Sequence, residues 1–396
     1  MRLFAACVIL IGTFLKGKGR RKAPLRAVSA TGLLYRNMNK RNLLVICGGQ
    51  SREHDISLLS AATVLRNLDP EKYNVKTVGI TKDGRWLLYP GSTDAMKTGD
   101  WEKDPGNLPC SILPDRAAHG MVILGKTPEF RRLDCIFPVL HGKNGEDGTI
   151  QGLFDLSGIP YVGCGVLASA VGMDKSFTKL VAASIGVTQA KYLVFRRHDY
   201  DKAPDSFLNR AEEELGYPLF VKPANAGSSV GISKAKNRAS LRDAVMLAFA
   251  HDRKIVLEEA VVGRELETAV LGNEEPTAAV VGEVLPAEEF YSYDAKYNNA
   301  ASVLVIPAEL PDGVSDRIRE TAIRIFSALD GRGLSRVDFF LRERDGEIVF
   351  NEINTLPGFT DISMYSKLFD AAGVPYGDLV DRLVVCALEE HGEAKA

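Results

Sequence analysis

The N-terminal third of the chain alternates short, β-rich hydrophobic runs with amphipathic stretches. Residues 43–47 and 74–81 form two such runs, with the amphipathic stretch 55–68 between them, and residues 133–140 form a later run. An order of strand, helix and strand predicts a parallel sheet with helices on its faces. Residues 89–126 are less regular and rich in Gly, Pro and Asp, which predicts an insertion or long connection in this first domain.

The alternation continues in two further units. The second unit is expected to contain helix 173–184, strand 191–195, a helix that ends at residue 215, and strand 218–223. The third is expected to contain strands 265–271 and 277–285, a polar loop at 286–300, helix 314–329 and a β-hairpin. The sequence therefore predicts an α/β protein, α+β in part, with three domains at residues 38–166, 167–262 and 263–396.

Residues 1–37 do not follow this pattern. An apolar run at residues 3–15 is too short to span a bilayer, and a basic cluster at residues 16–22 follows it. A signal peptide would have its basic residues before the apolar run. We expect a dispensable extension or a mis-assigned start, because the stretch that begins at Met38 resembles the natural start of a protein. A weak membrane tether is the alternative.

Composition limits the possible partners. Lys plus Arg (49) nearly balance Asp plus Glu (51), so no global positive field is available to bind nucleic acid. The six cysteines are scattered without a CxxC pair, which is typical of small core residues in a reducing compartment. No run is long and apolar enough to predict a membrane span. We expect a cytoplasmic protein that binds a small molecule, with no membrane partner.

The stretch 335–358 predicts two strands joined by a turn at Asp345 and Gly346. Side chains alternate with period two, so three residues share a face on each strand: Arg336, Asp338 and Phe340 on the first, and Phe350, Glu352 and Asn354 on the second. With a three-residue loop at 344–346, Asp338 would lie opposite Glu352 and Arg336 opposite Asn354. Two carboxylates and an amide oxygen would then converge.

Oxygen ligands gathered on one rigid face suit Mg²⁺, which takes one or two carboxylates and completes its shell with water and substrate phosphates. The sequence therefore predicts a Mg²⁺ site at Asp338, Glu352 and Asn354. A solvated hairpin face with an Arg–Asp pair is the alternative. The turn at Pro357 and Gly358 can bring backbone N–H groups toward an anion.

A strand that ends in Lys222 leads into a loop of small residues. Gly227, Ser228, Ser229 and Gly231 let backbone N–H groups approach phosphate oxygens, and Lys222 adds a positive charge. The loop is not a Walker A motif, because no Lys-Ser or Lys-Thr pair follows its last glycine. Alone it fits an ordinary turn as well as a phosphate site, but a metal site downstream favours phosphate.

Residues 163–168 match the dinucleotide fingerprint GxGxxA and follow a short strand. The next predicted strand ends in Arg196 and Arg197 and lacks the acidic residue that binds a ribose hydroxyl. A nicotinamide cofactor is therefore disfavoured. The turn is interpreted as a link between two domains.

Two more stretches place polar residues directly after predicted strands. Glu53 and His54 lie at the start of a helix whose N-terminus can hold an anionic group, although Asp55 as a capping or first-turn acid also explains the pattern. His141 lies in a loop, where a single histidine is more often a structural hydrogen-bonding group than a catalyst.

Four motifs occur in one order: GGQSREHDIS at 48–57, HGKNGEDGTIQG at 141–152, KPANAGSSVGIS at 222–233, and RVDFF with NEINTLPGFT between 336 and 360. The stretch YSYDAKY at 291–297 lies between the last two. From Met38 to the C-terminal helix, the chain resembles the D-alanine–D-alanine ligases of the ATP-grasp superfamily. The resemblance implies a three-domain ATP-grasp fold. It also implies ATP-dependent joining of two D-alanine molecules through a D-alanyl phosphate, as needed for peptidoglycan precursors.

The resemblance further implies a set of site residues. ATP would lie between the second and third domains, on Lys179, Lys222, Glu258, Glu259, Val261, Glu265 and Lys296. Two Mg²⁺ or Mn²⁺ ions would bind Asp338, Glu352 and Asn354. The reaction would depend on Glu53, Ser228, Tyr297, Arg336 and Gly358, and the D-alanine subsites on His141, Ser363 and Met364.

Within this set the implied roles differ. Glu53 would bind the ammonium group of the first D-alanine, and Arg336 with the backbone N–H of Gly358 would stabilise the oxyanion that forms when the second amine attacks. Glu259 and Ala260 stand where some members of the family have Lys and Trp, a departure that concerns the adenine edge.

Tyr297 favours a dipeptide product over a D-alanine–D-lactate ester in this family. D-serine or D-lactate as the second substrate stays open. A nucleotide-binding regulator without turnover stays open too, as does an ATP-grasp ligase for another carboxylate and amine. The enzyme is expected to be a homodimer.

Overall fold

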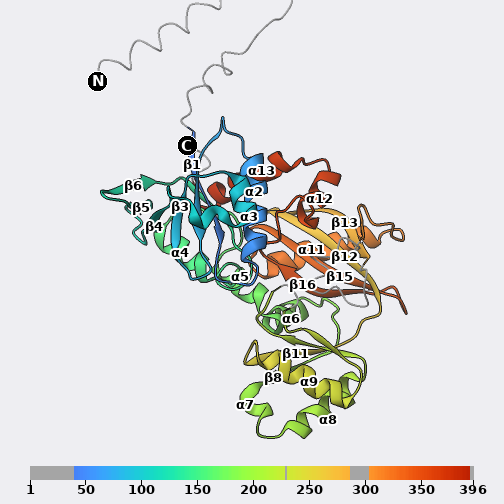
Figure 1. The fold of residues 1–396 in the computed structure, drawn as a ribbon. Helices are drawn as coiled ribbons and strands as arrows, with labels where there is room; N and C mark the ends of the chain where they lie inside the picture. Colours follow the sequence, from blue (N-terminus) through green and yellow to red (C-terminus); the bar gives the residue numbers. More distant parts are fainter. Residues whose placement is uncertain (1–39, 228–229, 286–302, 393–396) are drawn as a thin grey trace, which may run out of the picture. The chain divides into compact units, whose positions relative to one another are not determined.

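The computed structural model of the chain describes residues 40–227, 230–285 and 303–392 (Figure 1). The predicted extension at 1–37 and the predicted site residues Ser228, Lys296 and Tyr297 lie outside these ranges. Within them, no helix has the length and apolar character that crossing a membrane requires.

The first part of the described chain forms a seven-stranded sheet with the order β6-β5-β4-β3-β2-β1-β7. Its strands are β1 (Arg41–Gly48), β2 (Tyr73–Ile80), β3 (Trp86–Tyr89), β4 (Leu108–Ile112), β5 (Gly120–Leu124), β6 (Pro128–Arg132) and β7 (Cys135–Val139). The strands β2, β1 and β7 are parallel, as predicted, and α2 (His54–Asn67) follows β1. Residues 43–47 are fully buried, as expected of a parallel strand that is covered on both faces.

The stretch 89–126, which the sequence predicts to be an insertion or long connection, contains regular elements. It contributes β4 and β5, which extend the sheet with antiparallel strands, as well as α3 (Thr93–Thr98) and the 3-10 helix η2 (Asp100–Lys103). Trp101 of η2 is 1% exposed and lies over Gly79, where a Cβ atom would come within 2.2 Å of the indole ring. Most of the Gly, Pro and Asp residues of this stretch lie between these short elements.

Three helices connect the first sheet to the second: α4 (Thr149–Ser157), α5 (Val166–Met173) and α6 (Lys175–Ser184). The helix predicted to begin at Met173 begins at Lys175. Asp174 stands before it as the N-cap, because its side chain accepts hydrogen bonds from the N–H groups of Ser176 and Phe177.

The second sheet has four antiparallel strands in the order β10-β9-β11-β8. They are β8 (Tyr192–Arg196), β9 (Leu219–Pro223), β10 (Ser233–Ala235) and β11 (Lys254–Glu259). The helices α7 (Arg197–Tyr200), α8 (Pro204–Leu215) and α9 (Arg238–Phe249) accompany it (Figure 1). Leu208 of α8 and Leu241 of α9 share a buried core with Val221 of β9, so this sheet has a hydrophobic core of its own.

The third sheet has five strands in the order β14-β13-β12-β15-β16. They are β12 (Gly263–Gly272), β13 (Thr277–Leu285), β14 (Val303–Val305), β15 (Gly333–Arg342) and β16 (Ile348–Asn354). One face packs against α11 (Val314–Ala328), and the other against α12 (Met364–Ala371) and α13 (Tyr376–Glu390). The core under α12 and α13 also contains residues of β1 and β7, so it joins this sheet to the first one. The domain boundaries at 166 and 262 stay predictions.

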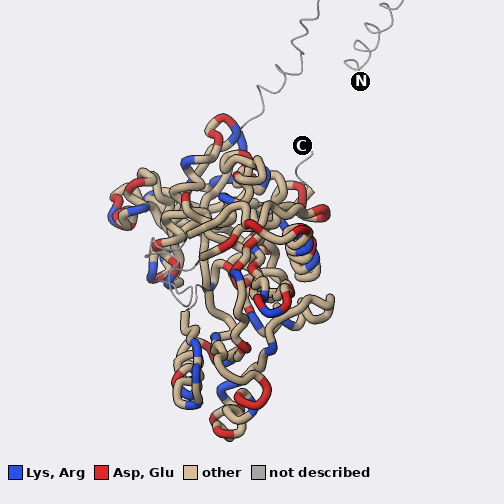
Figure 2. Tube along the Cα trace, turned by 90° about the vertical axis from the view of Figure 1, so that its right-hand side faces the viewer, with Lys and Arg blue, Asp and Glu red and all other residues tan. Residues whose placement is uncertain are grey.

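Figure 2 shows basic and acidic residues interspersed along the described chain. The described cysteines are free, and all of them except Cys386 are buried. Burial raises the pKa of the Cys47 thiol to about 12. The buried cysteines are therefore small core side chains, as their scattered positions predict.

Candidate active site

The predicted hairpin is β15 with β16, and its register agrees with the prediction: Arg336 pairs with Asn354 and Asp338 pairs with Glu352. The loop between the two strands, however, differs in length from the predicted loop. The backbone N–H of Arg342 donates to the carbonyl of Glu347 at 2.9 Å, which leaves a loop of four residues rather than three. A register shift next to Asp338 compensates for the extra loop residue.

The register shift also corrects one predicted side-chain direction. Phe350 does not share a face with Glu352 and Asn354, because it packs in the core on the other side of the sheet, with its ring centroid 6.0 Å from that of Phe339. The neighbouring Asn351 is instead within reach of the polar side, where Lys222 Nζ donates to its Oδ1 at 3.4 Å.

Arg336 lies between two buried carboxylates. Its Nε and Nη2 donate to Oδ1 and Oδ2 of Asp338, each at 2.8 Å, and its Nε is 2.9 Å from Oε2 of Glu267. Burial alone would lower the pKa of Arg336, but Asp338 and Glu267 outweigh burial and raise that pKa well above its usual value. The guanidinium is therefore held as a fixed positive charge.

The predicted metal ligands are chemically suited to a divalent ion. Asp338, Glu352 and Asn354 bring two carboxylates and an amide oxygen to adjacent strands, and Asp338 is 8% exposed. No group of three or more His, Cys, Asp and Glu residues in the described ranges could hold a metal ion. The fit therefore depends on the amide of Asn354 and on oxygens from a substrate, a ligand set that Mg²⁺ commonly accepts.

A second charged cluster joins the four-stranded sheet to α6. Lys179 Nζ is 3.4 Å from Glu258 Oε1, and Lys222 Nζ donates to Glu258 Oε2 at 3.0 Å. Burial would raise the pKa of Glu258, but the two ammonium groups outweigh it and lower that pKa to about 2. Burial lowers the pKa of Lys179, whereas the pKa of Lys222 is raised because Glu258 and Glu352 outweigh its burial.

This cluster fits an anionic ligand. Lys179 is 1% exposed, and in the part of the chain that the structure describes its Nζ has no hydrogen-bond partner beyond the 3.4 Å ion contact with Glu258. A buried ammonium group with unused donors is stabilised by further acceptors, and phosphate oxygens supply them.

Three of the other predicted nucleotide residues lie on or next to β11 and β12. Glu259 Oε1 accepts from the backbone N–H of Lys191 at 3.0 Å, so this side chain is tied to the start of β8. Val261 follows β11 and is partly exposed. Glu265 lies on β12, paired with Phe340 of β15.

Three of the sequence motifs meet around Glu53, which is 8% exposed. A Cβ atom on Gly142 would come within 2.1 Å of Glu53 Oε2, and one on Gly227 within 3.1 Å. Ser51 Oγ donates to the carbonyl of His141 at 2.6 Å and so ties the first motif to the second. The carboxylate of Glu53 therefore lies against two glycines from distant parts of the chain.

His141 is buried in a polar setting of its own. Its Nε2 is 3.2 Å from Ser60 Oγ, and its Nδ1 is 3.2 Å from the carbonyl of Leu356 and 3.5 Å from Glu146 Oε1. Burial would lower the pKa of His141, but Glu146 and Glu53 outweigh burial and raise it. Neither Ser60 nor Glu146 was predicted from the sequence. Glu146 lies within the motif 141–152, which was the available signal for it, whereas Ser60 carried none.

Gly358, Ser363 and Met364 lie together after β16. A Cβ atom on Gly358 would come within 2.9 Å of Ser363 Oγ, which also accepts from the backbone N–H of Thr360 at 2.9 Å. Ser363 is the N-cap of α12, and Met364 is the first residue of that helix. Phe359 N–H donates to Ser60 Oγ at 3.2 Å, so this turn also contacts the surroundings of His141.

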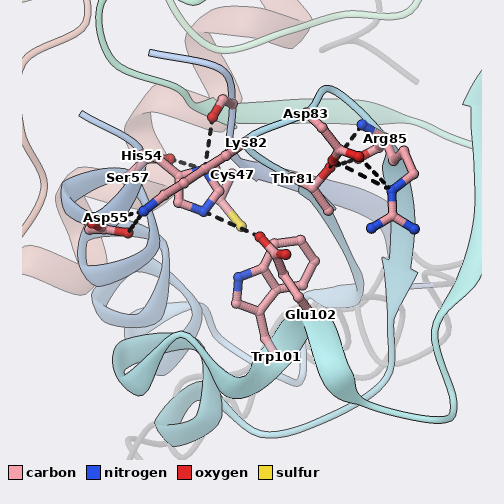
Figure 3. Close-up of polar contacts among 12 residues, drawn as sticks. Cys47, His54, Asp55, Ser57, Thr81, Lys82, Asp83, Arg85, Trp101 and Glu102 are labelled. Carbon is pink, nitrogen blue, oxygen red and sulfur yellow. Dashed lines mark hydrogen bonds and ion pairs between the residues drawn. The ribbon is translucent and has the colours of Figure 1, made fainter. Parts of the chain in front are cut away.

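His54 lies beside the Glu53 site rather than in it. Its Nδ1 is 2.7 Å from the carbonyl of Gly49, its Nε2 is 3.8 Å from Glu102 Oε1, and its ring stacks on Trp101 at 6.4 Å (Figure 3). Asp55 is in the first turn of α2 and pairs with Lys82, whose Nζ is 3.0 Å from Oδ1. It therefore supports the helix N-terminus as a first-turn acid and does not cap it.

The turn at 163–168 lies against Arg332, the residue directly before β15. Cys164 Sγ lies 3.3 Å from the carbonyl of Arg332, and a Cβ atom on Gly165 would come within 2.7 Å of the Arg332 guanidinium. The interpretation of the turn as a link between two domains stays a prediction.

Comparison with known proteins gives one consistent result. The family models described as "D-ala D-ala ligase N-terminus" and "D-ala D-ala ligase C-terminus" match residues 42–164 and 181–385. The chain is 46% identical over 367 residues to the D-alanine--D-alanine ligase of Acetivibrio thermocellus, which covers 90% of this chain and 98% of that protein. It is 49% identical over 359 residues to the D-alanine--D-alanine ligase of Heliobacterium modesticaldum. This match covers 90% of this chain and 97% of that protein.

Solved structures agree with these relatives. The VanG D-Ala:D-Ser ligase from Enterococcus faecalis is 37% identical and superposes with a TM-score of 0.81, over 88% of this chain and 100% of that one. The D-alanine-D-alanine ligase from Coxiella burnetii is 34% identical with a TM-score of 0.78, over 90% of this chain and 96% of that one.

Proposed function

The chain belongs to the D-alanine–D-alanine ligase family, and from this membership we infer that it joins two D-alanine molecules to D-alanyl-D-alanine in an ATP-dependent reaction. The predicted α/β architecture of an ATP-grasp ligase is confirmed. The product is a building block for cell-wall synthesis. The roles of individual residues in this reaction are our proposals.

The phosphates of ATP are proposed to bind at Lys179 and Lys222, on the two ammonium groups that flank Glu258. This assignment is supported by the unused donors of the buried Lys179. Asp338, Glu352 and Asn354 would hold the divalent ions, which we propose to be Mg²⁺ or Mn²⁺. When bound, these ions would neutralise the charge of the β- and γ-phosphates.

In the first chemical step, the carboxylate of one D-alanine takes the γ-phosphoryl group of ATP, and ADP leaves. Glu53 is proposed to bind the ammonium group of this D-alanine, because its buried carboxylate lies beside the glycine-rich loop at Gly227. His141 would form part of the same subsite. These groups orient the substrate carboxylate toward the phosphates and so replace a random encounter with a fixed geometry.

In the second step, the amine of the other D-alanine attacks the acyl carbon and loses a proton, and inorganic phosphate leaves. The fixed positive charge of Arg336 and the backbone N–H of Gly358 are proposed to stabilise the oxyanion that forms. Ser363 and Met364 at the start of α12 would hold the carboxylate of the second substrate. The roles that the family resemblance implies for Ser228, Tyr297 and Lys296 stay predictions.

The convergence of Gly142 and Gly227 on the Glu53 carboxylate supports this proposal most strongly, because it unites the substrate motifs with the glycine-rich loop. Incubation of the purified protein with ATP, Mg²⁺ and D-alanine should give D-alanyl-D-alanine, ADP and phosphate in equal amounts. ATP hydrolysis without dipeptide, or no reaction, would refute it.

D-serine as the second substrate is the alternative that a specific observation favours, since the VanG D-Ala:D-Ser ligase superposes on this chain at 37% identity. D-alanine is preferred, because the relatives at 46% and 49% identity are D-alanine--D-alanine ligases. Competition among D-alanine, D-serine and D-lactate at several pH values separates these possibilities, since an amine must be deprotonated to attack. The homodimer and the cytoplasmic location stay predictions.

A further inference from the structure

Ser60 lies in the middle of α2, and its hydroxyl group contacts two residues from distant parts of the chain. The side chain is fully buried. Its Oγ is 3.2 Å from Nε2 of His141, which follows β7. It also accepts from the backbone N–H of Phe359, which lies after β16, at 3.2 Å. One hydroxyl group thus joins a histidine of the proposed first substrate subsite to the turn that contains Gly358.

The same turn contacts His141 at its other end. Nδ1 of His141 lies 3.2 Å from the carbonyl of Leu356. A carbonyl oxygen only accepts hydrogen bonds, so Nδ1 carries the proton in this contact. Together with the two contacts of Ser60, this bond closes a hydrogen-bonded frame around the turn between Leu356 and Phe359.

The surroundings of this frame are packed. Phe359 is fully buried, its ring centroid is 5.8 Å from that of Phe137, and its carbonyl accepts from the hydroxyl of Tyr376 at 2.7 Å. Leu356 is 3% exposed and belongs to the same hydrophobic core. In such a buried setting, leaving the N–H of Phe359 without an acceptor is unfavourable. The hydroxyl of Ser60 therefore stabilises one position of the turn.

We propose that Ser60 is a positioning residue that holds His141 and the Gly358 turn in one hydrogen-bonded frame, and so couples the first substrate subsite to the stabilisation of the oxyanion. This proposal rests on the proposed function for the roles of His141 and Gly358. A hydroxyl group has one donor and two lone pairs. Ser60 can therefore accept from Phe359 and still serve Nε2 of His141, as a donor to a neutral ring or as an acceptor from a protonated one. The frame matters for the second step because a displacement of about 1 Å can cost about 100-fold in rate.

Two substitutions and a matched control test the proposal. Ser60→Ala removes the hydroxyl group with little change in volume, and Ser60→Cys keeps the shape but has a weak hydrogen-bonding group. Ser157→Ala is the control, because Ser157 is also fully buried and its hydroxyl donates to the carbonyl of Phe154 within α4 at 2.8 Å. Amide hydrogen exchange at Phe359 and the nitrogen NMR signals of the His141 imidazole are measured on the full ligand-free chain. Steady-state kinetics with ATP and D-alanine varied separately give kcat and each KM.

In Ser60→Ala, we expect exchange at Phe359 to be about tenfold faster and kcat to be about tenfold lower, which is the scale of one buried hydrogen bond. The Nε2 signal of His141 should shift, and the KM for the first D-alanine should rise. The KM for ATP should stay within about twofold, because the frame holds no residue that is proposed to bind the nucleotide. Ser60→Cys should change each quantity in the same direction by less, and Ser157→Ala should change none of them.

Three results in Ser60→Ala would each overturn the proposal: unchanged exchange at Phe359, an unshifted Nε2 signal of His141, or a KM for ATP that rises as much as kcat falls. An equal loss of kcat in Ser157→Ala would also overturn it, because the effect would then be one of overall stability.

Failure of the two proposals can be told apart. If the unsubstituted protein formed no D-alanyl-D-alanine, the proposed function would fail, while exchange and NMR on the ligand-free chain would still decide whether Ser60 holds the frame. If ligation were normal in both the unsubstituted protein and Ser60→Ala, the positioning role alone would fail. If Ser60→Ala did not fold, as judged by circular dichroism, Ser60→Cys would carry the comparison with Ser157→Ala.

Discussion

Arg336 and Asp338 form a two-point ion pair in which Nε and Nη2 each donate to a separate carboxylate oxygen at 2.8 Å. Both side chains are largely buried, at 14% and 11% exposed. The residue proposed to bind metal is therefore also the partner of the residue proposed to stabilise the oxyanion. Any cation bound by Asp338 must share these oxygens with Arg336, so the two roles can be separated only by substituting each residue in turn.

Asp338→Asn keeps the size of the side chain and removes its charge. We expect kcat/KM to fall by at least about 100-fold, the scale of losing one electrostatic group at a reacting centre, and the Mn²⁺ concentration for half-maximal activity to rise. A coupled assay for ADP over a metal titration measures both. Asp316→Asn, at an aspartate that is 73% exposed, is the control. Full ligation by Asp338→Asn would remove Asp338 from the metal site.

Arg336→Lys keeps the positive charge but cannot reproduce a two-point pair with a carboxylate. The loss should lie in kcat, by about 100-fold, with little change in the KM for ATP, because the oxyanion forms only after ATP has bound. Steady-state kinetics with ATP and D-alanine varied separately tests this, and Arg317→Lys on the exposed side of α11 is the control. A rise in the KM for ATP alone would assign Arg336 to nucleotide binding instead.

The hairpin of β15 and β16 shows which structural features could be predicted from the sequence. Alternation and the Asp345–Gly346 turn predict the pairs Arg336 with Asn354 and Asp338 with Glu352, and the structure contains both. The loop is one residue longer than predicted, and a register shift beside Asp338 restores the pairing. Neither feature could be predicted, because three-residue and four-residue loops share the same turn residues. Phe350 was therefore assigned to the wrong face.

Contacts between segments that are distant in the sequence are the second kind of feature that could not be predicted. Period and composition place Glu53 after one strand and His141 after another, but nothing local predicts that Ser60 Oγ lies 3.2 Å from His141 Nε2. Likewise, Lys179 and Glu258 entered the candidate site through family resemblance, because a lysine within an amphipathic helix normally indicates an exposed face. Only the tertiary structure, which brings Lys179 of α6 within 3.4 Å of Glu258 of β11, makes Lys179 a buried charge.

Glu258→Gln tests the buried charge cluster through its pH dependence. The folded-state pKa of Glu258, about 2, lies below the usual 4.5. A depressed carboxyl pKa adds stability that is fully present above the unfolded pKa and is lost as pH falls through the folded pKa. The unsubstituted protein should therefore exceed Glu258→Gln in stability by on the order of 3 kcal/mol at pH 7, with the difference shrinking as pH falls from about 4.5 toward 2.

Thermal and denaturant unfolding of both proteins between pH 7 and pH 3 measures this difference. Glu71→Gln, at a glutamate whose side chain is 86% exposed, should match the unsubstituted protein throughout. A difference that stayed constant down to pH 3 would mean that Glu258→Gln acts through lost packing or a lost hydrogen bond. The two ammonium groups of Lys179 and Lys222 would then not be the cause of the effect.

Glu146→Gln tests the contact between Glu146 and His141, which the sequence did not predict. Burial lowers the pKa of His141, and Glu146 is the largest of the groups that outweigh it. Removing the carboxylate charge should therefore lower the pKa of His141, which NMR titration of its imidazole signals measures directly. Because Glu53 also raises this pKa, Glu53→Gln should move it in the same direction by a smaller amount.

The free energy of unfolding of Glu146→Gln should also depend on pH through His141. A histidine whose folded pKa is raised contributes stability that is fully present below the unfolded pKa of 6.5 and is lost as pH rises through the folded pKa. The unsubstituted protein should therefore exceed Glu146→Gln by about 2 kcal/mol near pH 5.5, the scale of a hydrogen bond to a charged group, and by less at pH 8. A gap that widened toward pH 8 would mean that His141 is neutral in its pair with Glu146.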